Sequence, residues 1–270
     1  MSNYHNTLSQ LSTAQPNYRI EIPESWGQGR ATFGGLIVSL LYKAMRLNVA
    51  QDRLIRTVSV SFVGPVARGA LDIEVTILRA GGSVTQVEAK ALQEGQVQCV
   101  VLASFGAKRD SELNIPAPLA PDAKPPEDCR EMPYIPGVLP EFTQHVCYRW
   151  AFGDMPFSNS KHHEMGGWIR FKQPEEELQH QPVDEAAVLS LVDAWPPALL
   201  PLYKKPAPAS SLSWYIEFIQ PIEAIDAESW LLYKADIDQV SSGYGQTHAQ
   251  LWSSDGELIA ISRQTIAVFA

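Results

Sequence analysis

The chain contains one strand-and-turn pattern twice, and this internal repeat limits the folds available to it. Residues 62–65 (FVGP) end an alternating apolar run, and residues 218–221 (FIQP) end a second one 156 positions later. A hairpin turn at residues 94–95 (EG) recurs at residues 255–256 (DG), 161 positions further on. The two copies therefore stay in register apart from a small change in loop length, and the sequence predicts a duplicated fold.

Each copy combines one apolar helix with antiparallel strands. Leu36 to Leu47 has apolar residues at helical spacing. From Arg56 to Phe105 the period changes to two, and the turns between strands are too short for parallel crossovers. In the second copy, Asp184 to Trp195 reads as a helix with Asp184 as its N-cap, followed by strands between Ser211 and Val268. A sheet wrapped around a central helix in each copy is an α+β fold. Shorter strands are predicted at Asn17 to Ile22, Gln144 to Trp150 and Gly167 to Phe171.

A proline-rich segment separates the copies. Eight prolines lie between residues 110 and 140, and proline does not fit inside a strand ladder or a helix. We therefore predict an N-terminal domain at residues 1–109, a linker at 110–140 and a C-terminal domain at 141–270.

Composition and charge exclude several classes of protein. A formal net charge of −9 argues against a nucleic-acid partner, because no basic stripe is present to neutralise phosphates. No stretch approaches the roughly 20 apolar residues of a membrane span, and residues 1–12 lack the pattern of a signal peptide. Three widely spaced cysteines favour a reducing compartment. We expect a cytoplasmic protein that binds neither membrane nor nucleic acid.

The order of motifs resembles the TesB-like acyl-CoA thioesterases, which have a double hot-dog fold. In the first copy the matching motifs are residues 32–35 (TFGG), 60–65 (VSFVGP), 77–86 (ILRAGGSVTQ) and 103–106 (ASFG). In the second copy they are residues 167–171 (GWIRF), 191–197 (LVDAWPP), 230–233 (WLLY) and 255–264 (DGELIAISRQ). The resemblance covers nearly the whole chain outside the linker. It implies hydrolysis of an acyl-CoA thioester to a free acid and CoA, without a cofactor or metal, and a role in fatty acid metabolism.

The resemblance also implies a set of site residues. The family holds its attacking water with an Asp, a Thr or Ser, and a Gln from the second half. At the matching positions this chain has Asp193, Ser211 and Gln264. Ser211 stands where the best-known members have Thr, and Ser213 is a possible substitute for it. An aspartate near the end of a helix has its charged form disfavoured by the macrodipole, which favours a role as general base.

The repeat indicates that only the second copy carries the chemistry. The counterpart of Gln264 in the first copy is Ala103, and the counterpart of Ser211 is Ile55. A glutamine on the inward face needs hydrogen-bond partners, so it is either a structural amide or a residue that holds the water. A serine in a strand, taken alone, is usually structural.

Gly34 and Gly35 begin the first helix without a side-chain cap. Their absent side chains allow close packing of the helix on the sheet. Their backbone N–H groups can also receive a thioester carbonyl oxygen, since a helix N-terminus favours negative charge. We therefore predict one site per chain, with its oxyanion donors from the first half and its base from the second.

Other sites are less well supported by the sequence. His162 and His163 lack a third ligand at zinc spacing, and no Gly-x-Ser-x-Gly nucleophile motif is present. Two alternatives remain open on the same fold. One is a non-catalytic protein that binds or senses acyl-CoA. The other is an enoyl-thioester hydratase, although the second helix lacks the His of the Asp/His pair typical of that class.

The duplicated halves should also determine the assembly. Single hot-dog chains pair by dimerising, and here both partners lie in one chain. We expect one chain to be the minimal active unit, within a homo-oligomer that is a dimer or tetramer of it. The acyl chain is predicted to lie in an apolar tunnel beside the second helix.

Overall fold

A computed structural model of the protein describes residues 4–172 and 182–269. Within these residues the α-helices are α1 (Tyr4–Leu8), α2 (Gly34–Leu47) and α3 (Glu185–Asp193). The long strands of the first half are β1 (Asn17–Ile22), β4 (Arg53–Phe62), β5 (Gly69–Ala80), β6 (Val84–Gln93) and β7 (Gln96–Ala107). Those of the second half are β9 (Val146–Phe152), β10 (Glu164–Phe171), β11 (Ala209–Phe218), β12 (Leu231–Ser241), β13 (Tyr244–Trp252) and β14 (Leu258–Val268).

Short elements connect these main elements. They are η1 (Glu24–Trp26), β2 (Gly27–Gln28), β3 (Ala31–Thr32), η2 (Pro126–Asp128), β8 (Arg130–Glu131), η3 (Glu141–His145) and η4 (Leu200–Leu202). Strands β2 and β3 form a separate small hairpin directly before α2. The predicted α+β content, both central helices and the antiparallel strands are confirmed.

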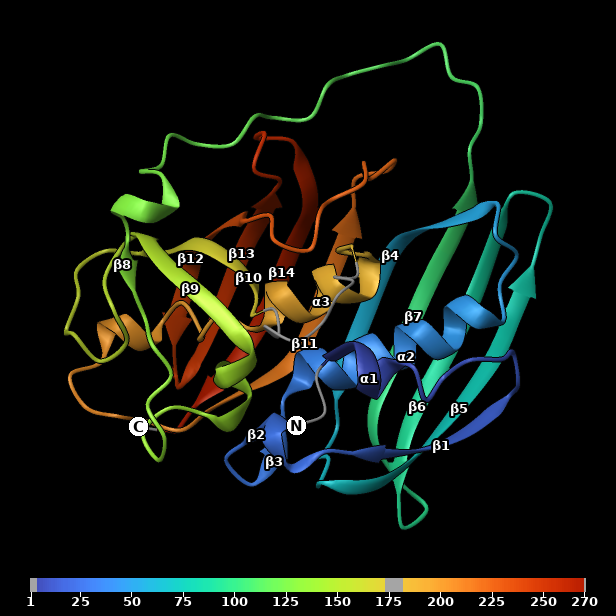
Figure 1. Ribbon diagram of the computed structural model, residues 1–270, viewed down its shortest axis with the longest axis horizontal. Coiled ribbons are helices and arrows are strands. Elements are labelled where there is room, and N and C mark those ends of the chain that lie inside the picture. Colours follow the sequence, from blue (N-terminus) through green and yellow to red (C-terminus); the bar gives the residue numbers. More distant parts are fainter. Residues whose placement is uncertain (1–3, 173–181, 270) are drawn as a thin grey trace.

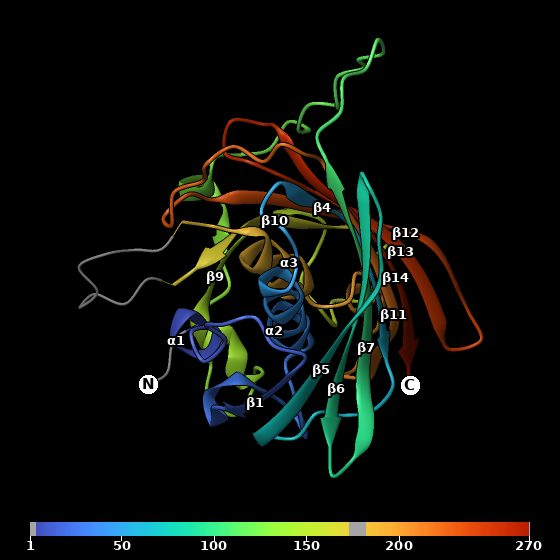
Figure 2. The same ribbon diagram turned by 90° about the vertical axis from the view of Figure 1, so that its right-hand side faces the viewer.

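One twelve-stranded sheet runs through both halves of the molecule. Its strand order is β1-β5-β6-β7-β4-β11-β14-β13-β12-β10-β9-β8. Strands β4 and β11 pair antiparallel in the middle, so the two repeats share one continuous sheet. Outward from this pair, β7, β6, β5 and β1 on one side match β14, β13, β12 and β10 on the other. The sheet curves around α2 and α3, which lie side by side inside it (Figure 1, Figure 2).

An approximate two-fold axis relates the halves. In the central strand pair, Ser59 lies opposite Tyr215, and the 156-residue offset of the repeat relates these same two residues. Inside the sheet the axis passes between the helices, where Ser39 Oγ lies 2.8 Å from Ser190 Oγ. Both serines are fully buried. The helices therefore cross at equivalent positions, and each helix end lies close to the other half.

Helix α2 is buried on nearly every side. Its residues from Gly35 to Tyr42 are all buried, and it packs against α3 and strands β5, β6 and β7. It has no side-chain cap at its N-terminus, as expected from the glycine pair. Helix α3 begins at the predicted cap, where Asp184 Oδ1 accepts a hydrogen bond from the Ala187 N–H at 2.8 Å.

The proline-rich segment connects the halves along the outside (Figure 1). Its second part contacts the C-terminal half: Ala120 N–H donates to the Gly256 carbonyl at 3.1 Å, and β8 pairs with β9 at the edge of the sheet. The boundaries at 109, 110, 140 and 141 stay predictions. The predicted domains include residues 1–3, 173–181 and 270, which lie outside the described residues.

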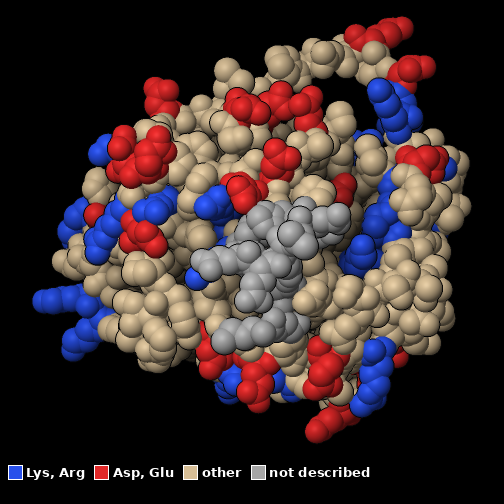
Figure 3. Space-filling model, viewed as in Figure 1, with Lys and Arg blue, Asp and Glu red and all other residues tan. Residues whose placement is uncertain are grey.

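The surface carries charges of both signs, with acidic and basic side chains interspersed on the face in Figure 3. Among the described residues, none of the helices has both the length and the apolar character needed to cross a bilayer.

Candidate active site

The three predicted polar residues of the second half meet at one point inside the curved sheet. Gln264 Nε2 donates a hydrogen bond to Ser211 Oγ at 2.8 Å. The same nitrogen lies 3.3 Å from Asp193 Oδ1, at the long end of the range for a hydrogen bond. Ser211 comes from β11, Gln264 from β14 and Asp193 from the last residue of α3. The amide of Gln264 therefore links the hydroxyl to the carboxylate.

A β-bulge decides which serine of β11 joins this group. Ser213 pairs with Thr265 and Ser211 pairs with Ile266, so Leu212 is an extra residue between them. Because of this insertion, Ser211 faces the helices on the same side as Trp214 and Gln264. Ser213 faces the opposite side of the sheet and lines a hollow there. The geometry thus brings Ser211, and not Ser213, to Asp193 and Gln264.

Asp193 lies between two helix ends with opposite effects on its charge. It is the last residue of α3, where a carboxylate is disfavoured, and it also lies at the N-terminus of α2, where one is favoured. A Cβ atom added to Gly34 would lie only 2.9 Å from Asp193 Oδ2. The glycine at this position therefore lets the carboxylate approach the helix start.

Burial dominates the protonation of Asp193. It raises the pKa of the carboxyl to about 7, although the backbone N–H of Gly35 and the amide of Gln264 both act to lower it. Removing a carboxylate from water penalises its charged form. With a pKa near neutrality, the side chain can both take up and release a proton at neutral pH.

Gly35 also sets how closely the two helices approach. A Cβ atom at Gly35 would lie 3.0 Å from the Cα of Ser190 on α3 and would collide with the ring of Phe33. The two roles considered for this glycine, close packing and a bare helix N-terminus, are thus compatible. The helix packing proves to be against α3 as well as the sheet. The role of its N–H as donor to a thioester carbonyl stays a prediction.

The charge of Asp193 acts on two tyrosines and one cysteine to which the sequence motifs assign no site role. Burial is the main cause that raises the pKa of Tyr148, Tyr233 and Cys99, and the Asp193 carboxylate raises each further. Tyr148 Oη donates to the Ala194 carbonyl at 2.8 Å and so fixes the chain directly after Asp193. The alternating strand pattern marks these positions as inward-facing. It gives no signal that they come close to Asp193, because they lie on distant strands.

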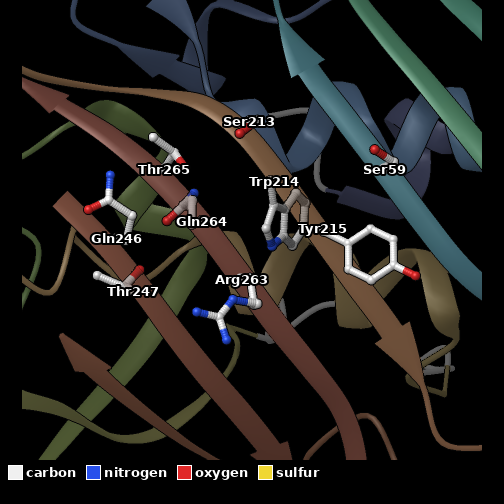
Figure 4. Close-up of a pocket in the computed structure, with 9 residues that line it drawn as sticks. All are labelled: Ser59, Ser213, Trp214, Tyr215, Gln246, Thr247, Arg263, Gln264 and Thr265. Carbon is white, nitrogen blue, oxygen red and sulfur yellow. The ribbon is translucent and has the colours of Figure 1, made fainter. Parts of the chain in front are cut away.

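Two hollows lie on the outer face of the sheet. One, of about 220 Å³, is lined by Ser59, Ser213, Tyr215 and Arg263 among others (Figure 4). The other, of about 360 Å³, adjoins it over Asp238 and His248. Gln264 borders the first hollow, but neither hollow includes Asp193 or Ser211. The predicted tunnel beside the second helix corresponds to neither of them.

Other chemistry-bearing residues stay apart from this site. His162 and His163 are exposed on a loop. Among the residues that the structure describes, no group of three or more His, Cys, Asp or Glu side chains is placed to hold a metal ion.

Family models match both halves of the chain. The model described as the acyl-CoA thioesterase N-terminal domain matches residues 22–106. The model described as the acyl-CoA thioesterase C-terminal domain matches residues 126–268. The chain belongs to the acyl-CoA thioesterase family. It is a thioester hydrolase, as the resemblance of its motifs implied.

Solved structures share the fold of this thioesterase over its whole length. A hot dog fold protein of unknown function from Alicyclobacillus acidocaldarius is 22% identical, with a TM-score of 0.85 over 99% of this chain and 98% of the other. The tesB protein of Mycobacterium avium subspecies paratuberculosis is 16% identical, with a TM-score of 0.76 over 99% and 100% of the two chains. The acyl-CoA thioesterase II TesB2 of Mycobacterium marinum is 20% identical, with a TM-score of 0.74 over 97% and 98%.

These similarities confirm the predicted double hot-dog fold of the thioesterase. At such low sequence identity they are evidence for the fold alone. No curated protein matches the sequence significantly. The roles of individual site residues are therefore argued from geometry.

Proposed function

We propose that the protein hydrolyses an acyl-CoA thioester with a water molecule activated by Asp193. The observation that carries this proposal is the position of the Gln264 amide, which links Ser211 Oγ and Asp193 Oδ1. The Asp193 carboxylate, the Ser211 hydroxyl and the Gln264 amide together suit a water molecule, which needs two to four polar partners.

The reaction can be written with these residues alone. Asp193 takes a proton from the water as its oxygen attacks the thioester carbonyl carbon. The resulting tetrahedral oxyanion accepts hydrogen bonds from the backbone N–H groups of Gly34 and Gly35 at the start of α2. The Gly35 N–H, which acts on the Asp193 carboxylate beforehand, turns to the oxyanion once that carboxyl has taken up the proton. The C–S bond then breaks, CoA leaves as a thiolate, and the proton held by Asp193 passes to its sulfur. No covalent acyl-enzyme forms.

Typical rate enhancements agree with the roles assigned to these residues. A positioned general base contributes about 10²–10⁴-fold, and each oxyanion donor about 10²–10³-fold. A pKa of about 7 for Asp193 is close to the optimum for a base that must later return its proton. Ser211 and Gln264 orient the water and are not themselves required to change protonation.

Release of free CoA thiol from a panel of acyl-CoA substrates tests the activity. The expected result is turnover of at least one substrate, with acid and thiol formed in equal amounts. Stoichiometric binding without thiol release would support the acyl-CoA-sensing alternative. Addition of water to an enoyl-CoA without thiol release would support the hydratase alternative.

We further propose one productive site per chain, within a dimer or tetramer of the double hot-dog. Titration with a non-hydrolysable acyl-CoA should saturate at one equivalent per chain, and two equivalent sites would contradict the proposal. Separate expression of residues 1–110 and 141–270 should give inactive fragments, because the site needs α2 from one half and Asp193 from the other. A cytoplasmic location and a role in fatty acid metabolism are part of the same proposal.

A further inference from the structure

Four aromatic side chains form a connected cluster directly beyond Asp193. The ring of Trp195 stacks on Tyr233, with centroids 5.4 Å apart and planes 8° from parallel. It meets Trp150 edge-on at 5.0 Å and Tyr148 edge-on at 5.5 Å. We name these four residues the aromatic wall. They come from β9, β12 and the turn after α3, so the fold brings them together from three elements.

The aromatic wall is next to the carboxylate by two independent measures. Trp195 follows Asp193 by two residues, and Tyr148 holds the carbonyl of the intervening Ala194 at 2.8 Å. The charge of Asp193 also acts on the hydroxyls of Tyr148 and Tyr233, since it raises the pKa of both beyond the effect of burial. A group bound at Asp193 therefore lies close to these rings.

The space behind the carboxylate is filled. Tyr148, Trp195, Trp150 and Tyr233 are only 1%, 5%, 7% and 8% exposed. Stacked and edge-to-face aromatic pairs hold one another in place beyond their burial alone. On the side of the first half, Phe62 lies against Gly34, where its ring would be 3.1 Å from an added Cβ, and Cys99 is 1% exposed. A long alkyl chain could extend from Asp193 toward the aromatic wall only by displacing these side chains.

We propose that the aromatic wall restricts the acyl group to short chains, with Trp195 as the residue that sets the limit. This inference rests on the proposed function, because it assumes that the thioester reacts at Asp193. An acyl group attached to a carbonyl beside Asp193 meets the flat face or edge of a packed ring within a few carbons. Overpacking a well-filled core is unfavourable, so each added carbon beyond that point should reduce productive binding.

The first test uses the unaltered protein with a series of acyl-CoA substrates from acetyl through butyryl and octanoyl to palmitoyl. We expect kcat/KM to peak at a short chain and to fall by about 10-fold or more between butyryl and octanoyl, since a shaped pocket discriminates by such factors per group. Equal or faster hydrolysis of octanoyl-CoA and palmitoyl-CoA would overturn the chain-length inference while leaving the thioesterase proposal intact. If no acyl-CoA is hydrolysed, the proposed function fails and the inference fails with it.

The second test removes the wall. Trp195→Ala and the milder Trp195→Leu should raise the ratio of octanoyl to butyryl kcat/KM by about 10-fold, because the space left by the ring accepts the longer chain. Phe105→Leu is the matched control, since Phe105 is a fully buried ring in the first half that stacks on Tyr42. It loosens the core to a similar degree and should leave the ratio unchanged. An unchanged ratio in a folded Trp195→Leu variant, or an equal change in Phe105→Leu, would exclude Trp195 as the determinant.

Discussion

The two halves of this thioesterase have the same scaffold but differ in the polar side chains at equivalent positions. The two helices are aligned on the contact between Ser39 and Ser190, which are 151 residues apart. At the same offset, Tyr42 is the counterpart of Asp193. In the sheet, Val58 lies opposite Ala103 as Trp214 lies opposite Gln264. A bulge follows Ile55 in β4 as one follows Ser211 in β11. The backbone is repeated faithfully, and the side chains are not.

In the first half the equivalent site is filled. The ring of Tyr42 stacks on Phe105 with centroids 6.2 Å apart, and the Arg46 guanidinium lies 5.4 Å from the centre of the same Phe105 ring. Burial raises the pKa of Tyr42 well above its usual value, so its hydroxyl stays protonated. Glu185, at the start of α3, occupies the position equivalent to Gly34. The comparison teaches that a duplicated fold can keep both halves of its sheet while the proposed site takes only the start of one helix from the first half.

The largest expected effect is a difference in activity between variants at equivalent positions of α3 and α2. Asp193→Asn keeps the shape of the side chain and removes its basicity, so kcat/KM for acyl-CoA hydrolysis should fall by about 10²-fold or more. Tyr42→Phe, at the equivalent position of the first half, should change it by less than about twofold. Thiol-release kinetics on both folded variants measure the difference. Wild-type activity in Asp193→Asn would remove this residue from the role of base.

A second comparison concerns the activity of variants on the inner and outer faces of the sheet. Gln264→Ala and Ser211→Ala should each lower kcat by roughly 10- to 100-fold, because each removes a group proposed to orient the water. Ser213→Ala is the matched control two residues away on the outer face, and it should retain full activity. If Ser213→Ala were impaired and Ser211→Ala were not, the assignment that follows from the bulge would be wrong.

The pH dependence of activity should follow Asp193. As the proposed base, Asp193 must be deprotonated to act, and its pKa is about 7. Log kcat/KM should therefore rise with a slope of about one below this pH and level off above it. The Tyr42→Phe variant should show the same profile. If the profile showed no inflection near neutral pH, the ionisation of Asp193 would not control the rate.

The same raised pKa should make stability fall with rising pH, whereas activity should rise. The folded protein binds a proton at Asp193 more tightly than the unfolded chain does, because the folded pKa of about 7 exceeds the ordinary value of 3.8. This contribution is fully present below the unfolded pKa and is lost as the pH rises through the folded pKa. As the pH rises from 3.8 to about 7, the free energy of unfolding of the wild type should thus decrease relative to that of Asp193→Asn. Chemical denaturation across that range provides the measurement.

The smallest effect concerns the helix crossing itself. Gly35→Ala places a methyl group 3.0 Å from the Ser190 Cα, and overpacking of this kind costs about 1–3 kcal/mol of unfolding free energy. Gly82→Ala is the control, since an added Cβ there meets nothing within 4 Å. Its unfolding free energy should stay within about 1 kcal/mol of the wild-type value or rise slightly. Equal destabilisation by both substitutions would show that the close approach of α2 to α3 is not what penalises a methyl group at Gly35.

Much of this molecule follows from local patterns in the sequence. The period of apolar residues determines that 34–47 is a helix and that 53–107 forms strands, because each pattern buries one face only in its own conformation. The repeat of turn motifs predicts the duplication, and the cap at Asp184 marks the start of α3. Motif resemblance also led to Asp193, Ser211 and Gln264 as a set, and these three meet in space.

Only the tertiary structure decided how these parts combine. Neither the continuity of the sheet through β4 and β11 nor the choice of Ser211 over Ser213 is readable from the sequence, because both depend on strand register and on one bulged residue. The pKa of Asp193 and the aromatic wall beside it likewise arise from contacts between elements far apart in the chain. Local sequence fixes the preference of each segment for helix or strand, whereas burial and register depend on which distant segments pack against it.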